Sequence, residues 1–198
     1  KIKDALNDNF NFSDLVILTR NNKEITKIAT YLTEKGVPII SSESLLLKKS
    51  PIVKFLLNNL KVLLDESDHL SKARLIEHLI VNNIINLGEL SPHNIIADFA
   101  RSNNSTFELF LNQYGIRYDS DRLNKLNIYE LTENLIRLYS IDKKDSLYVT
   151  FFLDFIFEFS IKQSNSIPNF LNFWNQKKDS ASIVTPSAIN AVEIMTIH

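Results

Sequence analysis

The first forty residues combine two short apolar runs with one stripe of apolar residues at helical spacing. Residues Leu15–Thr19 form a β-branched apolar run, which predicts a strand. Apolar side chains then recur three and four residues apart, which predicts a helix with one buried face; they are Ile25, Ile28, Ala29 and Leu32. Gly36 suits the end of that helix, and Val37–Ile40 begins a second strand. A strand, a helix and a parallel strand in so short a stretch imply a right-handed crossover in an α/β sheet.

The stretch from residue 50 to residue 186 has the apolar periodicity of helices and no alternating pattern of a strand. Ser50 and Pro51 are typical of a helix N-cap and first turn, and a strongly apolar helix follows them. Further helices are predicted around residues 70–82, 105–113, 128–140, 146–162 and 167–176. Polar breaks between helices are predicted at Ser91–Asn94 and at Ser164–Pro168.

The last eight residues, Ala191–His198, have the pattern of a buried strand. Thr196 and His198 are two residues apart near its end, so their side chains leave the same face. A chain that stops on such a strand and starts at Lys1 is expected to be a piece of a larger protein. We expect this strand to join the first sheet. The expected fold class is therefore mainly α with a small α/β part: a partial parallel sheet of strand, helix, strand and C-terminal strand, interrupted by a large all-helical insertion.

Composition narrows the function classes. The chain of 198 residues is 44% hydrophobic, which is enough for one or two ordinary cores. Its 22 basic and 23 acidic residues leave a formal charge of -1, so any nucleic-acid contact should be local. The absence of cysteine excludes disulfides, Cys-based zinc sites and thiol chemistry, and it fits a reducing, cytoplasmic location. No stretch approaches the roughly 18 apolar residues that a membrane span needs.

The three glycines exclude a phosphate-binding loop within this chain. Gly36, Gly88 and Gly115 are too far apart to form a GxGxxG or GxxxxGK[ST] motif. The chain is therefore not expected to be a complete nucleotide-hydrolysing enzyme.

Three segments resemble superfamily 1 DNA helicases of the UvrD/RecB type. Leu18–Asn22, with the helix and the Gly36–Ile40 segment after it, resembles the family's entry into its second RecA-like domain. The stretch from Ser41 to Lys54 resembles the passage into the family's inserted helical subdomain. Val192–His198 resembles the start of helicase motif V, which the family continues with Lys/Ser-x-Lys-Gly-Leu-Glu.

The resemblance implies that the intact protein is an ATP-driven DNA helicase or translocase. Residues 1–48 and 188–198 would form part of the second RecA-like domain, and residues 49–187 its inserted helical subdomain. ATP and Mg²⁺ would bind to Walker motifs outside this chain, which would have no ATPase activity by itself and no cofactor or metal of its own. Its partner would be single-stranded DNA, with a duplex junction or a nuclease subunit as further candidates.

The residues at one sheet edge are the candidate DNA ligands. Arg20, Asn21 and Asn22 follow a strand and begin a helix, where free N–H groups favour phosphate. Thr196 and His198 would lie at the same edge if the last strand is parallel to the first. The family holds single-stranded DNA at that edge: Arg20 would bind phosphate as a forked donor, the asparagines and Thr196 would donate hydrogen bonds, and His198 would bond or stack.

Each of these residues also has a purely structural explanation. Asn21 and Asn22 can cap the helix, with Glu24 completing a capping box three residues after Asn21. Arg20 can pair with Asp14 or Glu24, and a histidine at a strand end is usually a surface or core residue.

Other candidate chemistry is weaker. His69 and His78 are not spaced for one helical face, so a metal site is not expected. Asp154 and Glu158 are expected on a solvated helix face. The aromatic run is expected in the core; it comprises Phe151, Phe152, Phe155, Phe157 and Phe159. Solvated surface is expected for the paired lysines Lys48–Lys49, Lys143–Lys144 and Lys177–Lys178.

One departure from the family pattern bears on the subtype. UvrD, Rep and PcrA carry a Gly-Ile-Gly turn early in the inserted subdomain, where duplex DNA is held, whereas the matching region Ile80–Gly88 has a single glycine. The resemblance therefore shifts towards RecB- or AddA-like subunits, which act with a nuclease in DNA repair and recombination. The alternative is a helical protein-interaction module on a small α/β base with no nucleic-acid role.

Overall fold

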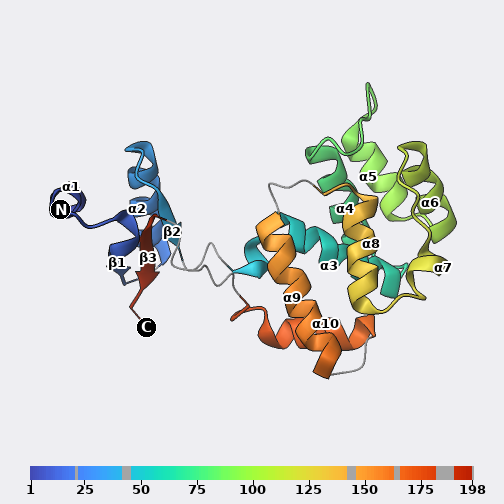
Figure 1. Cartoon of the computed structure of the whole chain (residues 1–198). Coiled ribbons are helices and arrows are strands. Elements are labelled where there is room, and N and C mark those ends of the chain that lie inside the picture. Colours follow the sequence, from blue (N-terminus) through green and yellow to red (C-terminus); the bar gives the residue numbers. More distant parts are fainter. Residues whose placement is uncertain (21, 42–45, 142–145, 163–165, 182–189, 198) are drawn as a thin grey trace. The chain divides into compact units, whose positions relative to one another are not determined.

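The computed structural model describes residues 1–20, 22–41, 46–141, 146–162, 166–181 and 190–197. The chain divides into two compact units, one made of residues 1–49 and 180–198 and the other of residues 50–179 (Figure 1). The first unit is therefore built from both ends of the sequence, and the second from one continuous stretch.

A three-stranded parallel sheet forms the first unit. Its strands are β1 (Val16–Thr19), β2 (Ile39–Ser41) and β3 (Val192–Thr196), in the order β1-β3-β2. β3 pairs with β1 so that Thr19 lies opposite Thr196. The expected parallel union of the first and last strands is confirmed. The sequence did not indicate the order, in which the last strand separates the two strands that are close in sequence.

Helix α2 (Asn22–Glu34) packs on the sheet through the predicted apolar stripe. Ile25 and Leu32 are buried against Ile194 of β3. The helix ends as the sequence predicted, because Gly36 has a φ of 72° and the Val37 N–H donates to the Leu32 carbonyl at 3.0 Å. This pattern is a Schellman motif, which needs a left-handed residue after the helix. Three short elements of this unit were not predicted: α1 (Ile2–Asn7), η1 (Phe12–Asp14) and η2 (Leu47–Lys49).

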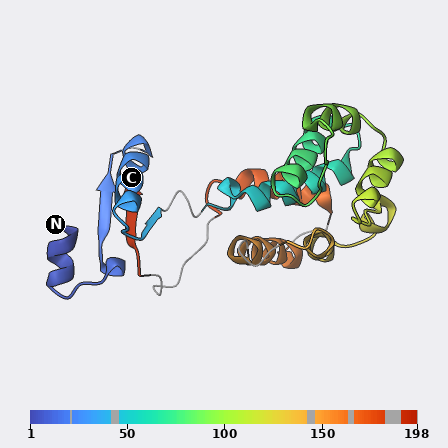
Figure 2. The ribbon, with the colours of Figure 1, turned by 90° about the horizontal axis from the view of Figure 1, so that it is seen from above.

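All regular elements of the second unit within the described residues are helices. Its helices are α3 (Pro51–Leu64), α4 (His69–Val81), α5 (Pro92–Ala100), α6 (Asn104–Gln113), α7 (Ser120–Leu123), α8 (Ile128–Leu138), α9 (Ser146–Lys162) and α10 (Ile167–Lys177). The cyan helix α3 lies among the others and contacts α4, α8, α9 and α10 (Figure 2). This position explains why α3 is apolar on nearly all sides, with even Asn58 and Asn59 buried.

The prediction of a polar break at Ser91–Asn94 was wrong. Ser91 is the N-cap of α5 and Pro92 lies in its first turn, the same Ser-Pro signal that begins α3. The second predicted break is too long by two residues, since Ile167 and Pro168 already belong to α10; the helix predicted over residues 167–176 is confirmed, and Ser164 lies outside the described residues. In both places a serine that caps a helix, Ser91 or Ser166, has the composition of a loop in the sequence.

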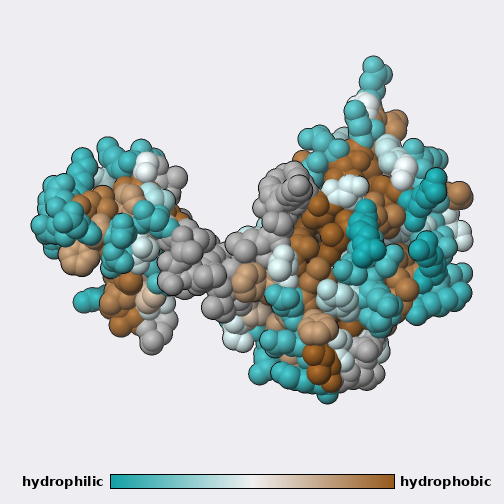
Figure 3. Space-filling model, viewed as in Figure 1, coloured by the Kyte–Doolittle hydropathy of each residue, from teal (hydrophilic) through white to brown (hydrophobic). Residues whose placement is uncertain are grey.

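The aromatic run of α9 is only partly core. Phe152 and Phe159 are buried and pack edge-on against Phe170 of α10. Phe157 is 52% exposed, so the prediction that it lies in the core was wrong; it packs against Tyr129 of α8 at the rim. Figure 3 shows hydrophobic residues reaching the surface of this unit between hydrophilic ones.

Two buried tyrosines of the helical unit differ in one hydrogen bond. The Tyr139 hydroxyl donates to Asn59 Oδ1 at 2.8 Å, and Asn59 Nδ2 donates to the Phe55 carbonyl at 3.0 Å. The Tyr118 hydroxyl is equally buried but has no hydrogen-bond partner among the described residues. A buried polar atom without a partner loses its hydration without compensation.

The same substitution is therefore expected to destabilise the protein at Tyr139 but not at Tyr118. Tyr139→Phe should lower the free energy of unfolding by about 1–2 kcal/mol, because Asn59 Oδ1 loses its donor. Tyr118→Phe should leave it unchanged or raise it by about 1 kcal/mol, because it removes only the unsatisfied hydroxyl. Urea denaturation of both variants measures the difference, and equal losses would contradict this assignment of partners.

Candidate nucleic-acid interface

The carboxyl ends of β1 and β3 meet at one edge of the sheet. Thr19 and Thr196 are opposite each other in the parallel register, and the Ile197 N–H donates to the Thr19 carbonyl at 2.9 Å. The Thr19 hydroxyl is turned inward and donates to the Met195 carbonyl at 3.3 Å. These bonds hold the two strand ends side by side, so Arg20, which follows Thr19, lies at the same edge as Thr196.

Arg20 lies on the surface at the start of α2. Its backbone N–H donates to Glu24 Oε2 at 3.1 Å, which fixes the main chain between β1 and the helix. The sequence predicted that Glu24 would complete a capping box with Asn21. In the structure, Glu24 accepts a hydrogen bond from the backbone N–H of Arg20, and Asn21 lies outside the described residues.

The structural alternatives for Arg20 can be compared with these contacts. The Asp14 carboxylate accepts from the Asn11 backbone N–H at 2.7 Å and completes the cap of η1. Glu24 accepts from the main chain of Arg20, and this bond does not involve the guanidinium group. The guanidinium belongs to an exposed residue and can approach a ligand from solvent.

Of the five predicted DNA ligands, the structure describes the side chains of two, Arg20 and Thr196. Arg20 is exposed and Thr196 is half-buried, and the sheet brings them to a common edge. Asn22 is the first residue of α2, but its side chain lies outside the described part of the chain. Asn21 and His198 also lie outside it, so their roles stay predictions. The signal that sequence reasoning missed at this edge is Thr19, whose inward hydroxyl bridges the two strands.

The histidines considered as metal ligands have other partners. His69 Nδ1 lies 3.0 Å from the Ala100 carbonyl oxygen, and the His78 ring stacks on Phe55 with 4.2 Å between the ring centroids. Within the described ranges, no three His, Cys, Asp or Glu side chains lie together in an arrangement that could hold a metal ion.

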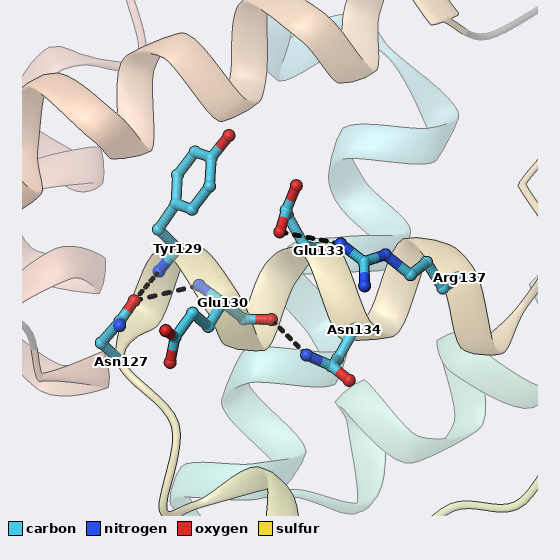
Figure 4. A network of polar contacts seen from close by, with 6 residues as sticks. All are labelled: Asn127, Tyr129, Glu130, Glu133, Asn134 and Arg137. Atoms are coloured by element: carbon cyan, nitrogen blue, oxygen red, sulfur yellow. Dashed lines mark hydrogen bonds and ion pairs between the residues drawn. The ribbon is translucent and has the colours of Figure 1, made fainter.

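Most charged groups on α8 are satisfied within that helix (Figure 4). The Asn127 side chain accepts from the N–H groups of Tyr129 and Glu130 and caps the helix. One turn further along, Arg137 forms an ion pair with Glu133 at 3.0 Å. These contacts are typical of a solvated helix face rather than a binding site.

Solvated surface was also predicted for the acidic pair of α9 and for the paired lysines. Asp154 and Glu158 are exposed on α9, as predicted for a solvated face. Lys178 donates to Asn175 Oδ1 at 3.2 Å beyond the end of α10, whereas Lys143–Lys144 lies outside the described residues.

The region matched to the Gly-Ile-Gly turn forms an irregular connection after α4. Asn83 and Gly88 both adopt left-handed backbone conformations, with φ values of 54° and 59°, and Ile85 between them is buried.

No helix in the described part of the chain is long and apolar enough to cross a membrane.

Comparison with known protein families is decisive at the level of the family. The model of the UvrD-like helicase C-terminal domain matches residues 1–198, the whole chain. No curated protein matches the sequence significantly. The two-unit organisation and the parallel strands at both chain ends agree with the helicase resemblance of the individual motifs. The chain belongs to the family of UvrD-like helicase C-terminal domains.

Proposed function

We propose that this chain is the part of an ATP-dependent DNA helicase or translocase that grips single-stranded DNA at the shared edge of β1 and β3. The observation that carries the proposal is the register that brings the end of β3, with Thr196, beside the end of β1, which leads into Arg20. Ligands of parallel α/β sheets bind beyond the carboxyl ends of the strands, which is where these residues lie.

The chemistry of this edge suits a sugar–phosphate backbone. The Arg20 guanidinium offers a planar fork of donors to phosphate oxygens, and α2 begins directly after this edge, where the N–H groups of a helix start favour phosphate. Thr196 offers a hydroxyl donor, and Asn21, Asn22 and His198 would add side-chain donors. Contacts of this kind hold the strand without selecting its sequence, as a translocating enzyme requires.

ATP and Mg²⁺ are assigned to another part of the helicase. A nucleotide's phosphates need a glycine-rich loop at a helix start, and the three glycines of this chain end or follow separate helices. The residues present therefore do not fit a nucleotide. We assign no step of hydrolysis to them, and we propose that the isolated chain has no ATPase activity.

The finer assignment is to a RecB- or AddA-like helicase that works with a nuclease in DNA repair and recombination. It is supported by the single glycine of the Ile80–Gly88 region, which replaces the Gly-Ile-Gly turn of UvrD-type enzymes. A nuclease domain or subunit is then the expected partner. The second candidate function is a helical protein-interaction module, which the large apolar helical unit favours.

Arg20→Ala is expected to weaken the binding of a fluorescent oligo(dT) strand to the intact helicase by about tenfold, the loss expected for one charge-assisted phosphate contact. The slope of log affinity against log salt should also fall by about 0.7, since one phosphate contact disappears. Fluorescence anisotropy across a range of salt concentrations measures both quantities.

The control for this experiment is Arg137→Ala, which removes the same charge from an exposed ion pair on α8. It should leave DNA affinity and its salt slope unchanged. If both arginine variants bind DNA like the parent protein, or lose affinity equally, the strand edge is not the DNA site.

A further inference from the structure

A groove runs between α3 and α4 of the helical unit. It consists of two adjoining hollows of about 510 Å³ and 400 Å³, which share Lys54, Asn58 and Arg74. Pro51, Phe55, Glu77, His78, Val81 and Asn82 complete the larger hollow, and Leu57 and Lys61 complete the smaller one. The residues from α3 run from the start of that helix to its last turn, so the groove follows the helix axis.

The charges along the groove are mainly positive. Lys54 and Lys61 are seven residues apart and therefore lie on one face of α3, with the buried Asn58 between them. Arg74 faces them from α4, and Glu77 is the one carboxylate among the lining residues. Neither Lys54 nor Arg74 forms an ion pair with a carboxylate of the described residues. Lys54 and Arg74 therefore present positive charge without an ion-pair partner among the described residues, whereas Lys61 lies near Asp68 and helps to lower the pKa of that carboxyl group.

Exposed apolar side chains extend the groove along α4. Leu70 is 60% exposed and Val81 is 72% exposed, and both lie on the face that carries Arg74 and Glu77, because the four residues are spaced by four, three and four positions. The two apolar residues are about 16 Å apart along the helix, or three turns. An amphipathic helix docks through apolar residues at helical spacing, and a spacing of three turns matches this pair.

We infer that this groove docks an acidic amphipathic helix of a protein partner. Carboxylates on the partner helix would lie against Lys54, Lys61 and Arg74, and apolar residues three turns apart would cover Leu70 and Val81. The inference goes beyond the proposed function, since it concerns the helical unit alone and assigns it a protein ligand.

The composition of the groove favours a protein over a nucleic acid. Phe55 lines its floor but is only 1% exposed, so its ring is not available for stacking with bases. The exposed Leu70 and Val81 would gain nothing from phosphates, whereas an apolar helix face would remove them from water.

A designed peptide tests the inference with the full chain. The probe is a fluorescein-labelled helix of about 20 residues with glutamate and leucine on one face, long enough to form a helix in water. A peptide with lysine in place of each glutamate and a labelled duplex DNA are the comparison ligands. We expect the acidic peptide to bind at least about tenfold more tightly than the lysine peptide, because the charges of the groove attract only the former.

Variants of the groove identify the site. Lys54→Glu combined with Arg74→Glu should weaken binding of the acidic peptide by about tenfold, and Val81→Ser by about threefold. Lys162→Glu, an equal charge change at an exposed position of α9, should have no effect. Circular dichroism of each variant establishes that it is folded, and because the substituted residues are exposed we expect all of them to fold.

Three results would overturn the inference: equal binding of the acidic and lysine peptides, equal losses in the Lys162 variant, or an effect of the charge variants without an effect of Val81→Ser. Tighter binding of the duplex that depends on Lys54 and Arg74 would identify a nucleic-acid groove instead. Because all of these residues lie in the helical unit, none of these results depends on Arg20 or on DNA binding at the strand edge.

Discussion

Phe55→Ala is expected to lower the free energy of unfolding of the helical unit by about 3–5 kcal/mol, the range for truncating a fully buried aromatic ring. Phe55 is 1% exposed in the central helix α3. Its ring stacks on His78 of α4 at 4.2 Å and meets Tyr139 edge-on at 4.8 Å. Alanine would leave a cavity between α3, α4 and the end of α8 that these rings cannot close without moving. Urea denaturation followed by far-UV circular dichroism measures the loss.

Phe157→Ala is the matched control, because it makes the same chemical change in a ring that is 52% exposed. It should cost about 1 kcal/mol or less, since most of that ring is already in water. If the two variants lose equal stability, α3 is not the centre of the helical core. The predicted difference is large enough to exceed the error of the extrapolation to water.

Alkaline solution is expected to destabilise the helical unit steeply above pH 10. Burial raises the pKa of both Tyr118 and Tyr139, so the native state keeps the protons that the unfolded state releases near pH 10. Each tyrosine then contributes stability that is complete below pH 10 and is lost as the pH rises further. The loss is roughly 2 kcal/mol for each tyrosine by pH 11.5. Urea denaturation at a series of pH values from 8 to about 11.5 measures it.

Lys72 acts in the opposite direction. Its side chain is buried, with Nζ donating to the Ser102 carbonyl at 2.7 Å, and burial lowers its pKa. The native state thus releases this proton before the unfolded state does, and stability rises with pH until the unfolded lysine also deprotonates.

The control for the tyrosines is the double variant Tyr118→Phe with Tyr139→Phe. It has neither of the two buried phenol groups and should lack the steep loss above pH 10. A loss of the same size in the double variant would show that other groups cause it.

Helices were predictable because their signals are local. The span predicted for α9 agrees with the structure at both ends, and Ser50 with Pro51 begins α3 as expected. Cap residues and apolar spacing act over a few positions, so they are visible without knowledge of the fold. The failure at Ser91–Asn94 has the same origin, because a helix start and a loop both use serine, proline and asparagine.

Burial within a helix was less predictable than the helix itself. Asp154 and Glu158 indicate the solvated face of α9, but the aromatic residues recur on all its sides, so apolar spacing alone does not show which of them are buried. The packing of α8 and α10 decides that Phe152 is buried and that Phe157 lies at the rim. The cations of the α3–α4 groove were missed for a similar reason, since the spacing of Lys54 and Lys61 is visible but Arg74 comes from another helix.

The sequence by itself determined which segments of this protein form helices or strands, and it indicated the family. Strand-like runs at both chain ends, a helical stretch between them and the flanking motifs were sufficient for the helicase resemblance, which the family match supports over the whole chain. Propensity, capping and apolar periodicity produce these features within a few residues of each position.

Only the tertiary structure decided which distant residues meet. β3 lies between β1 and β2, so Thr196 comes opposite Thr19, and the hydroxyl of Tyr139 reaches Asn59 in another helix. Such contacts form when the packing of whole faces outweighs the entropy lost in bringing distant parts of the chain together. Neither term can be read from a few neighbouring residues. The candidate DNA edge and the basic groove both arise from contacts of this second kind.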